Sequence, residues 1–277
     1  MTEALFTSRA CVRLPDPLKV AQDLCAHFVE RAEVAPHEAG GVISGEFGRA
    51  ELRAEGRNLH MIAQGSDSTT LYVVRSALAE HLFEFAGDDV PAFTWAGETA
   101  GEAAIPFFRE MRVVGTRQIT PHMRRVTLAG DVAHFDSDAG THVRLLIPPK
   151  DRMPIWPHSA PDGRTVWPKG ADTLTRRVHT IRRIDLSRGT LDIDMVLHED
   201  AIAPGSTWAA SAQPGDAVGV MGPGGGMPPA ADWHVLVGDE TALPVIAVSW
   251  TLLKTPAASE PSSRSPMNWS NRQSDPI

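Results

Sequence analysis

The feature that most constrains the fold is a series of short, strand-like segments separated by turn signals, which begins after residue 107. We expect strands at 111–119, 123–129, 142–147, 176–183, 191–197 and 217–221. Turns such as Ser187-Arg188-Gly189 and Gln213-Pro214-Gly215-Asp216 separate several of them. Many short strands with such turns are typical of a closed antiparallel barrel. The sequence therefore predicts an antiparallel β-barrel domain over residues 107–230.

One of these segments, Arg177-Val178-His179-Thr180-Ile181-Arg182, places three basic residues in a single strand of a chain whose net charge is −8. Because side chains alternate along a strand, Arg177, His179 and Ile181 are expected to share one face. A guanidinium matches phosphate, an imidazole can lie flat against an aromatic ring, and Thr180 offers a hydroxyl to a ring nitrogen. A flavin dinucleotide needs these contacts. From this segment alone, an exposed cationic strand is an equally open alternative.

A helix start is predicted downstream, where the strand that ends at His198 is followed by Pro204-Gly205-Ser206-Thr207-Trp208-Ala209-Ala210. Pro-Gly-Ser before small residues indicates an N-terminus, with Ser206 as the candidate N-cap. Free N–H groups and the helix dipole at such a point can receive a pyrophosphate. Most helix starts bind only their own cap, so this feature gains weight from its position after the cationic strand.

The N-terminal part, residues 8–86, is expected to form a small α+β domain. A helix after Pro15-Asp16-Pro17 should bury Val20, Leu24, His27 and Phe28, and a second helix should begin at Ser66 or Asp67. Strands are expected at 10–14, 49–54 and 58–63, with a hairpin turn at 56–58. Residues 87–106 are rich in Gly, Asp, Ala and Pro, which is typical of a linker.

Three later segments complete the predicted organisation. The excursion at 148–170, rich in Pro and Trp, is expected to be a long loop that could flank or cover a ligand. A strand at 233–237 followed by Gly238-Asp239-Glu240-Thr241-Ala242-Leu243-Pro244 predicts the start of an α/β unit over 231–253. Residues 254–277 lack periodicity and are expected to be disordered. Glycines 222, 224, 225 and 226 lack the order of a phosphate-binding loop, so a connecting turn is favoured there.

Composition excludes several classes of function. The net charge of −8 argues against sequence-independent binding of nucleic acid. Cys11 and Cys25 imply no disulfide framework and favour a reducing compartment, so a cytoplasmic location is expected. We find no apolar segment that suits a signal peptide or a membrane span. The histidines lack metal-ligand spacing, and neither a Ser-His-Asp arrangement nor paired carboxylates favour hydrolysis.

Seven short segments in order carry a resemblance to a known family. They are Gly140–Pro148, Arg177–Arg182, Val196–His198, Pro204–Ala209, Gln213–Asp216, Gly222–Gly225 and Gly238–Pro244. Over residues of about 108–248 the chain resembles the siderophore-interacting protein family, FAD-dependent ferric-siderophore reductases of the ferredoxin reductase superfamily. Residues 8–86 are similar to a small bacterial domain of unknown function that can precede this family.

The resemblance implies specific contacts with FAD. Arg177 would contact the flavin phosphates with support from Arg182, and His179 would stack on the isoalloxazine, where the family more often has Tyr. Thr180 would lie near the redox-active edge of the ring. The other implied FAD contacts are His198, Gly205, Ser206, Thr207, Trp208, Ala209, Asp239 and Thr241. The redox chemistry belongs to the flavin, so no catalytic acid or base is implied.

The implied activity is reduction of ferric siderophores with electrons passed from NAD(P)H through FAD. Family members continue well beyond residue 248 with a nicotinamide-binding sheet, so the pattern here predicts a truncated gene product, with 231–253 as a stub of that domain. The composition of 249–277 suggests a frameshift. Two alternatives stay open: a flavin-binding remnant without reductase activity, and a non-enzymatic siderophore- or anion-binding protein. The sequence indicates neither the siderophore, nor NADH against NADPH, nor the oligomeric state.

Overall fold

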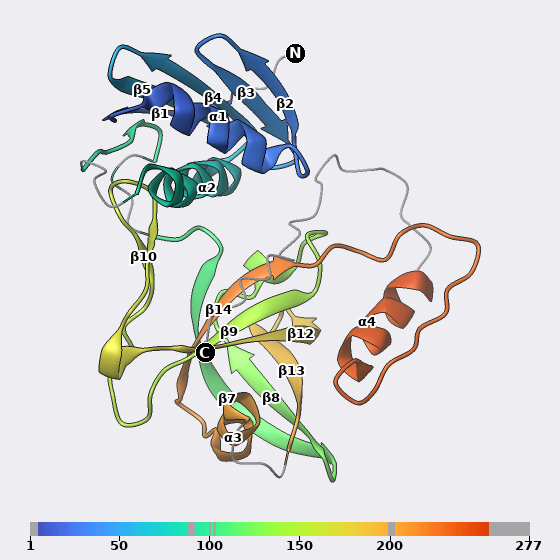
Figure 1. Ribbon diagram of the computed structural model, residues 1–277. Helices are drawn as coiled ribbons and strands as arrows, with labels where there is room; N and C mark the ends of the chain where they lie inside the picture. Colours follow the sequence, from blue (N-terminus) through green and yellow to red (C-terminus); the bar gives the residue numbers. More distant parts are fainter. Residues whose placement is uncertain (1–4, 88–91, 100, 102–103, 199–202, 255–277) are drawn as a thin grey trace. The chain divides into compact units, whose positions relative to one another are not determined.

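Two compact units make up the computed structural model, which describes residues 5–87, 92–99, 101, 104–198 and 203–254 (Figure 1). The N-terminal unit consists of Met1–Pro106 together with Pro157–Trp167. The barrel unit consists of Phe107–Trp156 together with Pro168–Ile277. No helix among the described residues is both long enough and apolar enough to cross a membrane.

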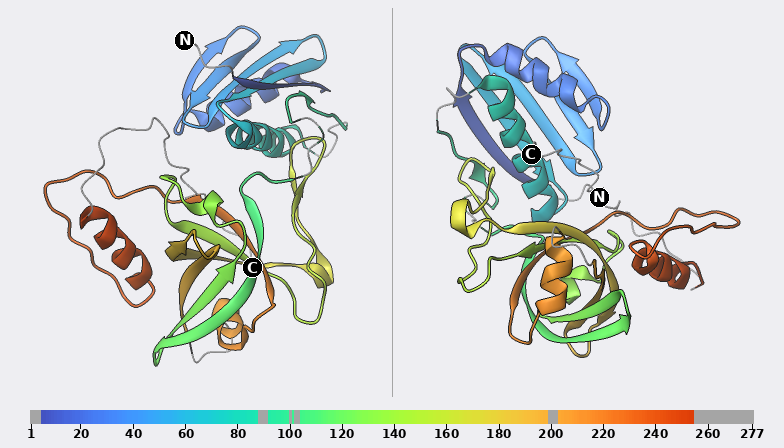
Figure 2. Two further views of the ribbon diagram at one scale, coloured as in Figure 1. Left: turned by 180° about the vertical axis from the view of Figure 1, so that it is seen from behind. Right: turned by 60° about the horizontal axis from the view of Figure 1, so that its bottom comes forward.

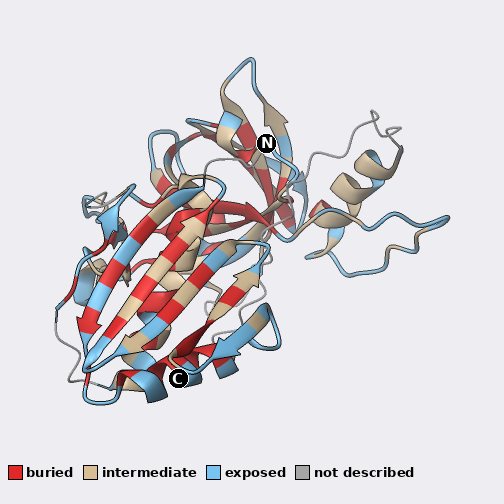
Figure 3. Ribbon diagram, turned by 90° about the horizontal axis from the view of Figure 1, so that it is seen from above, coloured by how far each residue is buried: buried red, intermediate tan, exposed pale blue. Residues whose placement is uncertain are grey.

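The N-terminal unit is an antiparallel sheet with two helices on one of its faces (Figures 1 and 2). Its strands are β1 (Phe6–Arg13), β2 (Glu33–His37), β3 (Gly40–Gly45), β4 (Gly48–Glu55), β5 (Asn58–Gly65) and β6 (Ala96–Gly97), in the order β2-β3-β4-β5-β1-β6. Buried residues alternate with intermediate or exposed ones along β4 and β5, and Figure 3 shows such banding along the strands of the sheet. This alternation gives the sheet one face for the core and one for solvent.

The helices of this unit begin where their capping residues place them. Helix α1 (Pro17–Phe28) follows Asp16, whose side chain accepts a hydrogen bond from the Lys19 amide. Helix α2 (Ser68–Ala86) follows Asp67, which forms a capping box with Thr70. A Cβ at Gly41 would lie 2.7 Å from Cys25 Sγ, so a glycine in β3 lets α1 pack closely on the sheet. Both expected helices are therefore present, and Cys25 is a buried packing residue.

A hairpin from the long loop also belongs to the N-terminal unit. Strands β10 (His158–Ser159) and β11 (Thr165–Val166) pair with each other. The hydroxyls of Tyr72 and Thr165 are 3.0 Å apart, and the indole N–H of Trp95 donates to Asp162 O at 2.8 Å. The guanidinium of Arg164 lies 3.4 Å from the centre of the Phe83 ring. Residues 157–167, which the sequence assigns to a ligand-flanking loop of the barrel, are thus packed on helix α2 and its surroundings.

The expected linker is also partly structured. Phe93 and Trp95 are buried in the core of the N-terminal unit, and β6 pairs with β1. Residues 92–97 therefore complete this unit instead of only leading away from it. The domain boundaries expected from the sequence, 8–86, 87–106, 107–230, 231–253 and 254–277, remain predictions.

The barrel unit contains the six strands that the sequence predicts. They are β7 (Phe108–Thr120), β8 (Met123–Ala129), β9 (His142–Ile147), β12 (Thr175–Asp185), β13 (Thr190–Val196) and β14 (Ala217–Gly224). All neighbours are antiparallel, and the order β12-β13-β8-β7-β14-β9 closes because β12 also pairs with β9. Short 3-10 turns lie at Ala133–Phe135 and Gly170–Asp172. Helix α3 (Pro204–Ser211) contributes Trp208 and Ala209 to the barrel core.

Two predictions about the end of the chain are wrong. Residues 233–237 form no strand, and Trp233 and Val237 are 75% and 85% exposed. The described residues offer this segment no partner strand, and an unpaired strand leaves its backbone hydrogen bonds unmade. Strand β14 runs through Gly224, so Gly222 and Gly224 are strand residues and not a connecting turn. Helix α4 (Leu243–Lys254) is present beside β12, and residues 255–277 lie outside the described part of the chain.

Candidate functional site

The cationic strand and the start of helix α3 meet at one place on the barrel unit. A Cβ at Gly205 would lie 3.4 Å from Arg177 Cγ and 3.7 Å from His179 Nε2. Arg177 and His179 therefore share the face of β12 that looks toward the helix tip. The next residue of that face, Ile181, is buried in the barrel core. The structure thus brings together the two features that the sequence singles out.

The tip of α3 has no side-chain cap. Its N-cap is Ala203, and the fixed φ of Pro204 suits the first helical position. The prediction that Ser206 is the N-cap is wrong, because Ser206 lies inside the first turn. Its hydroxyl instead accepts a hydrogen bond from the His198 amide at 2.7 Å, which ties the end of β13 to the helix. The first N–H groups of a helix have no intrahelical partners, so an uncapped tip can bind an anion.

The electrostatics of His179 set it apart from an ordinary surface histidine. Burial, together with the nearby Arg177 charge, lowers the pKa of His179 to about 4. The imidazole is therefore neutral at pH 7. Its Nε2 atom is buried and has no hydrogen-bond partner among the described residues. Buried polar atoms normally have partners, so an unpartnered one beside a helix tip indicates a ligand.

Arg177, which lies beside His179, also has few hydrogen-bond partners. Among the described residues, the Arg177 guanidinium donates one hydrogen bond, from Nη1 to the carbonyl of neighbouring Arg176 at 2.8 Å. No carboxylate of the described residues pairs with Arg177, although the chain has more acidic than basic residues. The guanidinium of an arginine has five N–H donors in a planar fork. Most of these donors therefore remain available to an anion.

His142 is a residue of this region that the sequence analysis did not select. It begins β9, directly opposite Thr180 in register, and its Nδ1 atom is also buried without a partner among the described residues. Burial lowers the pKa of His142. A Cβ at Gly225 would overlap the His142 ring, so the glycine run makes room for this histidine. The only available signal was a histidine at the start of a mostly apolar strand.

The remaining predicted residues occupy different surroundings. Thr180 is buried, and Arg182 stands at a bulge of β12 without a hydrogen bond or ion pair to the described residues. The side chain of His198 is exposed, as is that of Thr207. Trp208 and Ala209 have their side chains in the barrel core, so only their backbone could face a ligand.

Asp239 and Thr241 form a local turn ahead of α4. Asp239 Oδ1 accepts hydrogen bonds from the Thr241 amide at 2.9 Å and from its hydroxyl at 2.5 Å. These two bonds lower the pKa of Asp239. No contact given for the described residues joins this turn to Arg177 or to the α3 tip. The structure therefore brings together Arg177, His179, Gly205 and Ser206, whereas Arg182, Asp239 and Thr241 make no hydrogen bond or ion pair with them in the described part of the chain.

These residues fit an FAD molecule by three observations. An unpaired guanidinium and uncapped helical N–H groups suit a diphosphate. The buried, uncharged ring of His179 suits an aromatic system and has a nitrogen that lacks a partner. Gly205, which has no side chain of its own, lies directly against Arg177 and His179 and joins them to the helix tip. The class of protein that this fold defines is a six-stranded closed antiparallel barrel with a helix tip beside β12, and the residues there fit a flavin dinucleotide.

Comparison with known proteins gives the family. Residues 112–227 match the family described as siderophore-interacting FAD-binding domain. The barrel unit therefore contains a siderophore-interacting FAD-binding domain. Residues 9–96 match a second family, described as an uncharacterized protein conserved in bacteria (DUF2218).

Individual relatives agree with this assignment. The chain is 33% identical over 153 residues to the ferric vibriobactin reductase ViuB of Vibrio cholerae, covering 54% of this chain and 55% of that protein. It is 31% identical over 143 residues to the NADPH-dependent ferric-chelate reductase of Escherichia coli, covering 50% and 54%. A crystal structure of a siderophore utilization protein from T. fusca is 32% identical, with 61% and 70% covered and a TM-score of 0.39. The chain spans about half the length of the curated relatives it matches.

Proposed function

We propose that this chain binds FAD at the α3 tip and reduces ferric siderophores or related ferric chelates with electrons from NAD(P)H. The observation that carries the proposal is the buried, unpartnered Nε2 of His179 beside Arg177 and the uncapped helix. The family match supports FAD as the cofactor. The names of the reductases from V. cholerae and E. coli support a ferric chelate as the substrate.

Each residue of the site has a distinct proposed task. Arg177 and the amides of Gly205 and Ser206 hold the diphosphate, with the exposed His198 and Thr207 at the rim. His179 offers its neutral ring to the isoalloxazine, and Thr180 offers its hydroxyl to the ring edge. The backbone of Trp208 and Ala209 continues the helix behind the phosphates. Arg182, Asp239 and Thr241 remain outer contacts of the proposed site.

FAD, when bound, supplies the relay between a two-electron nicotinamide donor and a one-electron ferric acceptor. The protein orients the cofactor and sets its electrostatic surroundings. Hard oxygen ligands hold the divalent ion less tightly than ferric iron, so reduction favours release of the metal. Described residues 231–253 contain one helix and no strand, and by themselves they form no nicotinamide-binding sheet. The support for NAD(P)H as the electron donor is the name of the E. coli relative, an NADPH-dependent ferric-chelate reductase.

Two further parts of the proposal concern the surroundings of the protein. We place it in the cytoplasm, because its two cysteines are free. The chain's net charge of −8 supports a small-molecule substrate and no nucleic acid.

Binding of FAD to the purified chain tests the proposal directly. We expect a yellow protein, and we expect Arg177→Ala to raise the Kd for FAD roughly thirtyfold, about 2 kcal/mol, because one charge-assisted contact is lost. Arg13→Ala, at an exposed position of β1, is the matched control and should leave the Kd unchanged. Equal affinity in the wild type and Arg177→Ala would remove Arg177 from the site.

A second measurement separates the proposed activity from its alternatives. Steady oxidation of NAD(P)H in the presence of a ferric chelate supports a reductase. A chain that binds FAD but shows no such oxidation is a flavin-binding module. A colourless protein that takes up no FAD contradicts the proposal and favours a non-enzymatic anion-binding protein.

A further inference from the structure

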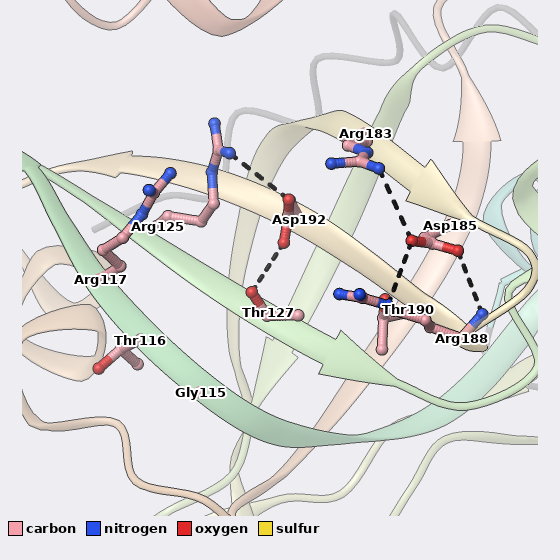
Figure 4. A pocket seen from close by; sticks show the side chains of 10 residues that line it. All are labelled: Gly115, Thr116, Arg117, Arg125, Thr127, Arg183, Asp185, Arg188, Thr190 and Asp192. Carbon is pink, nitrogen blue, oxygen red and sulfur yellow. Dashed lines mark hydrogen bonds and ion pairs between the residues drawn. The ribbon is translucent and has the colours of Figure 1, made fainter.

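A second cluster of arginines surrounds a cleft of about 330 Å³ on the barrel unit (Figure 4). Arg117 comes from β7, Arg125 from β8, Arg183 from β12, and Arg188 from the turn between β12 and β13. Asp185 and Asp192 also line the cleft. Arg177 and Arg183 are six residues apart on β12, about 20 Å at the rise of an extended strand. The cleft is therefore separate from the α3 tip.

The strand register places two of these arginines directly opposite each other. Arg117 pairs with Arg125 across β7 and β8. Like charges directly opposite in a sheet are destabilising. Arg125 is compensated, because it donates two hydrogen bonds to Asp194 at 2.6 and 2.8 Å. Arg117 is exposed and makes no hydrogen bond or ion pair with the described residues, so its charge has no counterpart there.

The other two arginines are only loosely held. Arg183 and Arg188 share Asp185, at 3.7 and 3.9 Å, which is beyond hydrogen-bond distance. Asp185 Oδ1 already accepts hydrogen bonds from the Ser187 hydroxyl and the Arg188 amide. Asp192 Oδ1 accepts a hydrogen bond from the Thr127 hydroxyl at 2.7 Å, and Oδ2 lies 3.5 Å from Arg125 Nη1. Both carboxylates of the cleft therefore already have hydrogen-bond partners within the protein, and neither makes a close ion pair with Arg183 or Arg188.

The donors that remain face the cleft from two directions. Figure 4 shows Arg117 on one side and the guanidinium groups of Arg183 and Arg188 on the other. Each guanidinium presents five N–H donors, and few of these have acceptors. Even after Asp185, Asp192 and Asp194 are counted, the four arginines leave an excess of positive charge in an acidic chain.

We propose that this cleft binds a small anion that carries two or more phosphate or carboxylate groups. One group lies at Arg117 and another between Arg183 and Arg188. A single charge would satisfy only one side of the cleft, whereas a ligand with two anionic groups spans it. Planar guanidinium forks match both carboxylate and phosphate oxygens, so the two chemistries share this site. The inference is independent of the proposed reductase activity.

Calorimetric titration of the full chain with pyrophosphate and, separately, with citrate tests the site. We run both titrations in Arg177→Ala protein, which disables the candidate phosphate site at the α3 tip. Arg117→Ala with Arg183→Ala, added to this background, should weaken binding at least tenfold. Arg13→Ala is the matched control and should change nothing. Circular dichroism and thermal melting check that each variant folds, and Arg117→Lys, which keeps the charge, should lose less affinity than Arg117→Ala.

The outcomes separate the sources of the anion. Binding of pyrophosphate alone identifies a phosphate ligand, and binding of citrate alone identifies a carboxylate ligand. Binding of both supports the shared chemistry. Failure of both to bind overturns the proposal, as does equal binding by folded protein with and without Arg117 and Arg183. Binding of a long polyanion such as heparin, with neither small anion bound, also overturns it.

Discussion

The two ends of strand β12 both carry arginines, but their surroundings differ. At the end near α3, Arg177 and His179 face a helix tip, with no carboxylate of the described residues paired to either. At the other end, Arg183 lies among aspartates, and its side chain is 67% exposed. The first end lacks partners inside the protein. The second end supplies part of its own compensation.

Burial makes the contrast sharper. Desolvation lowers the pKa of His179 to about 4, and its buried Nε2 has no partner among the described residues. Asp185 at the opposite end is only partly buried, and its pKa is lowered mainly by the hydrogen bond from Ser187. A count of arginines alone would favour the exposed cleft as the principal site. The unsatisfied buried atom favours the α3 end, because such an atom is costly unless a ligand meets it.

The first prediction concerns the Arg125–Asp194 ion pair, which neutralises the charge of Arg125 beside the exposed cleft. Asp194→Ala should destabilise the protein by about 3 kcal/mol, because it leaves the partly buried Arg125 without its bidentate partner. Urea unfolding at pH 7 measures the change. Asp131→Ala removes the partner of Arg109 at an exposed position and should cost much less. An equal loss of unfolding free energy in the two variants would show that the partly buried Arg125–Asp194 pair stabilises the protein no more than an exposed ion pair does.

The second prediction follows from the pKa of His179. The unfolded chain binds a proton at this residue near pH 6.5, whereas the folded protein does so only near pH 4. The folding stability therefore falls as pH decreases through this window, by on the order of 2 kcal/mol between pH 7 and pH 5 for His179. His179→Phe keeps an aromatic face and removes this contribution.

Urea unfolding of both proteins at pH 7, 6 and 5 isolates the effect of His179. The pKa values of His27, His134 and His142 are also lowered, mainly by burial, so part of the slope is common to the wild type and the variant. The difference between the two profiles belongs to His179. If unfolding free energy changes with pH equally in both proteins, the pKa of His179 is the same in the folded and unfolded states. His179 would then be no more shielded from solvent than the residues of the exposed cleft.

Strand periodicity predicts the direction of the β12 side chains only as far as Ile181. Alternation predicts that Arg177, His179 and Ile181 share a face, and the contacts with Gly205 and the burial of Ile181 agree. By the same parity Arg183 would point into the core. The register shift between Ile181 and Arg183 turns it outward instead, opposite Asp192. A bulge depends on the pairing of two strands, so the sequence of one strand does not reveal it.

Local signals predicted the elements that local physics decides. The six barrel strands and the start of α2 after Asp67 follow from alternation and capping chemistry. The segment 233–237 has a strand pattern but no neighbour to pair with among the described residues. Hairpin residues 157–167 belong to the N-terminal unit because of distant partners such as Tyr72 and Trp95. Contacts between residues far apart in the sequence decide both cases.

The candidate site was predictable in its cations but not in its hydrogen bonding. Arg177 and His179 were selected from their chemistry, and the helix tip from Pro204 and Gly205. The hydrogen bond from the His198 amide to Ser206 depends on how β13 packs against α3. The burial of His142 Nδ1 depends on the pairing of β9 with β12. The spacing of residues in the sequence predicts neither of these tertiary contacts.

The smallest expected effect sharpens the comparison at the α3 end. Ser206→Ala should destabilise the protein by about 1 kcal/mol, because the His198 amide loses its acceptor in a partly buried place. Ser211→Ala, in the last turn of the same helix, removes a hydroxyl that only donates to backbone carbonyls and should have little effect. If Ser206 also fixes the helix tip, Ser206→Ala raises the Kd for FAD while Ser211→Ala does not. Loss of stability without loss of affinity would show that the tip keeps its position without this bond, and that Arg177 and His179 alone define the flavin end of β12.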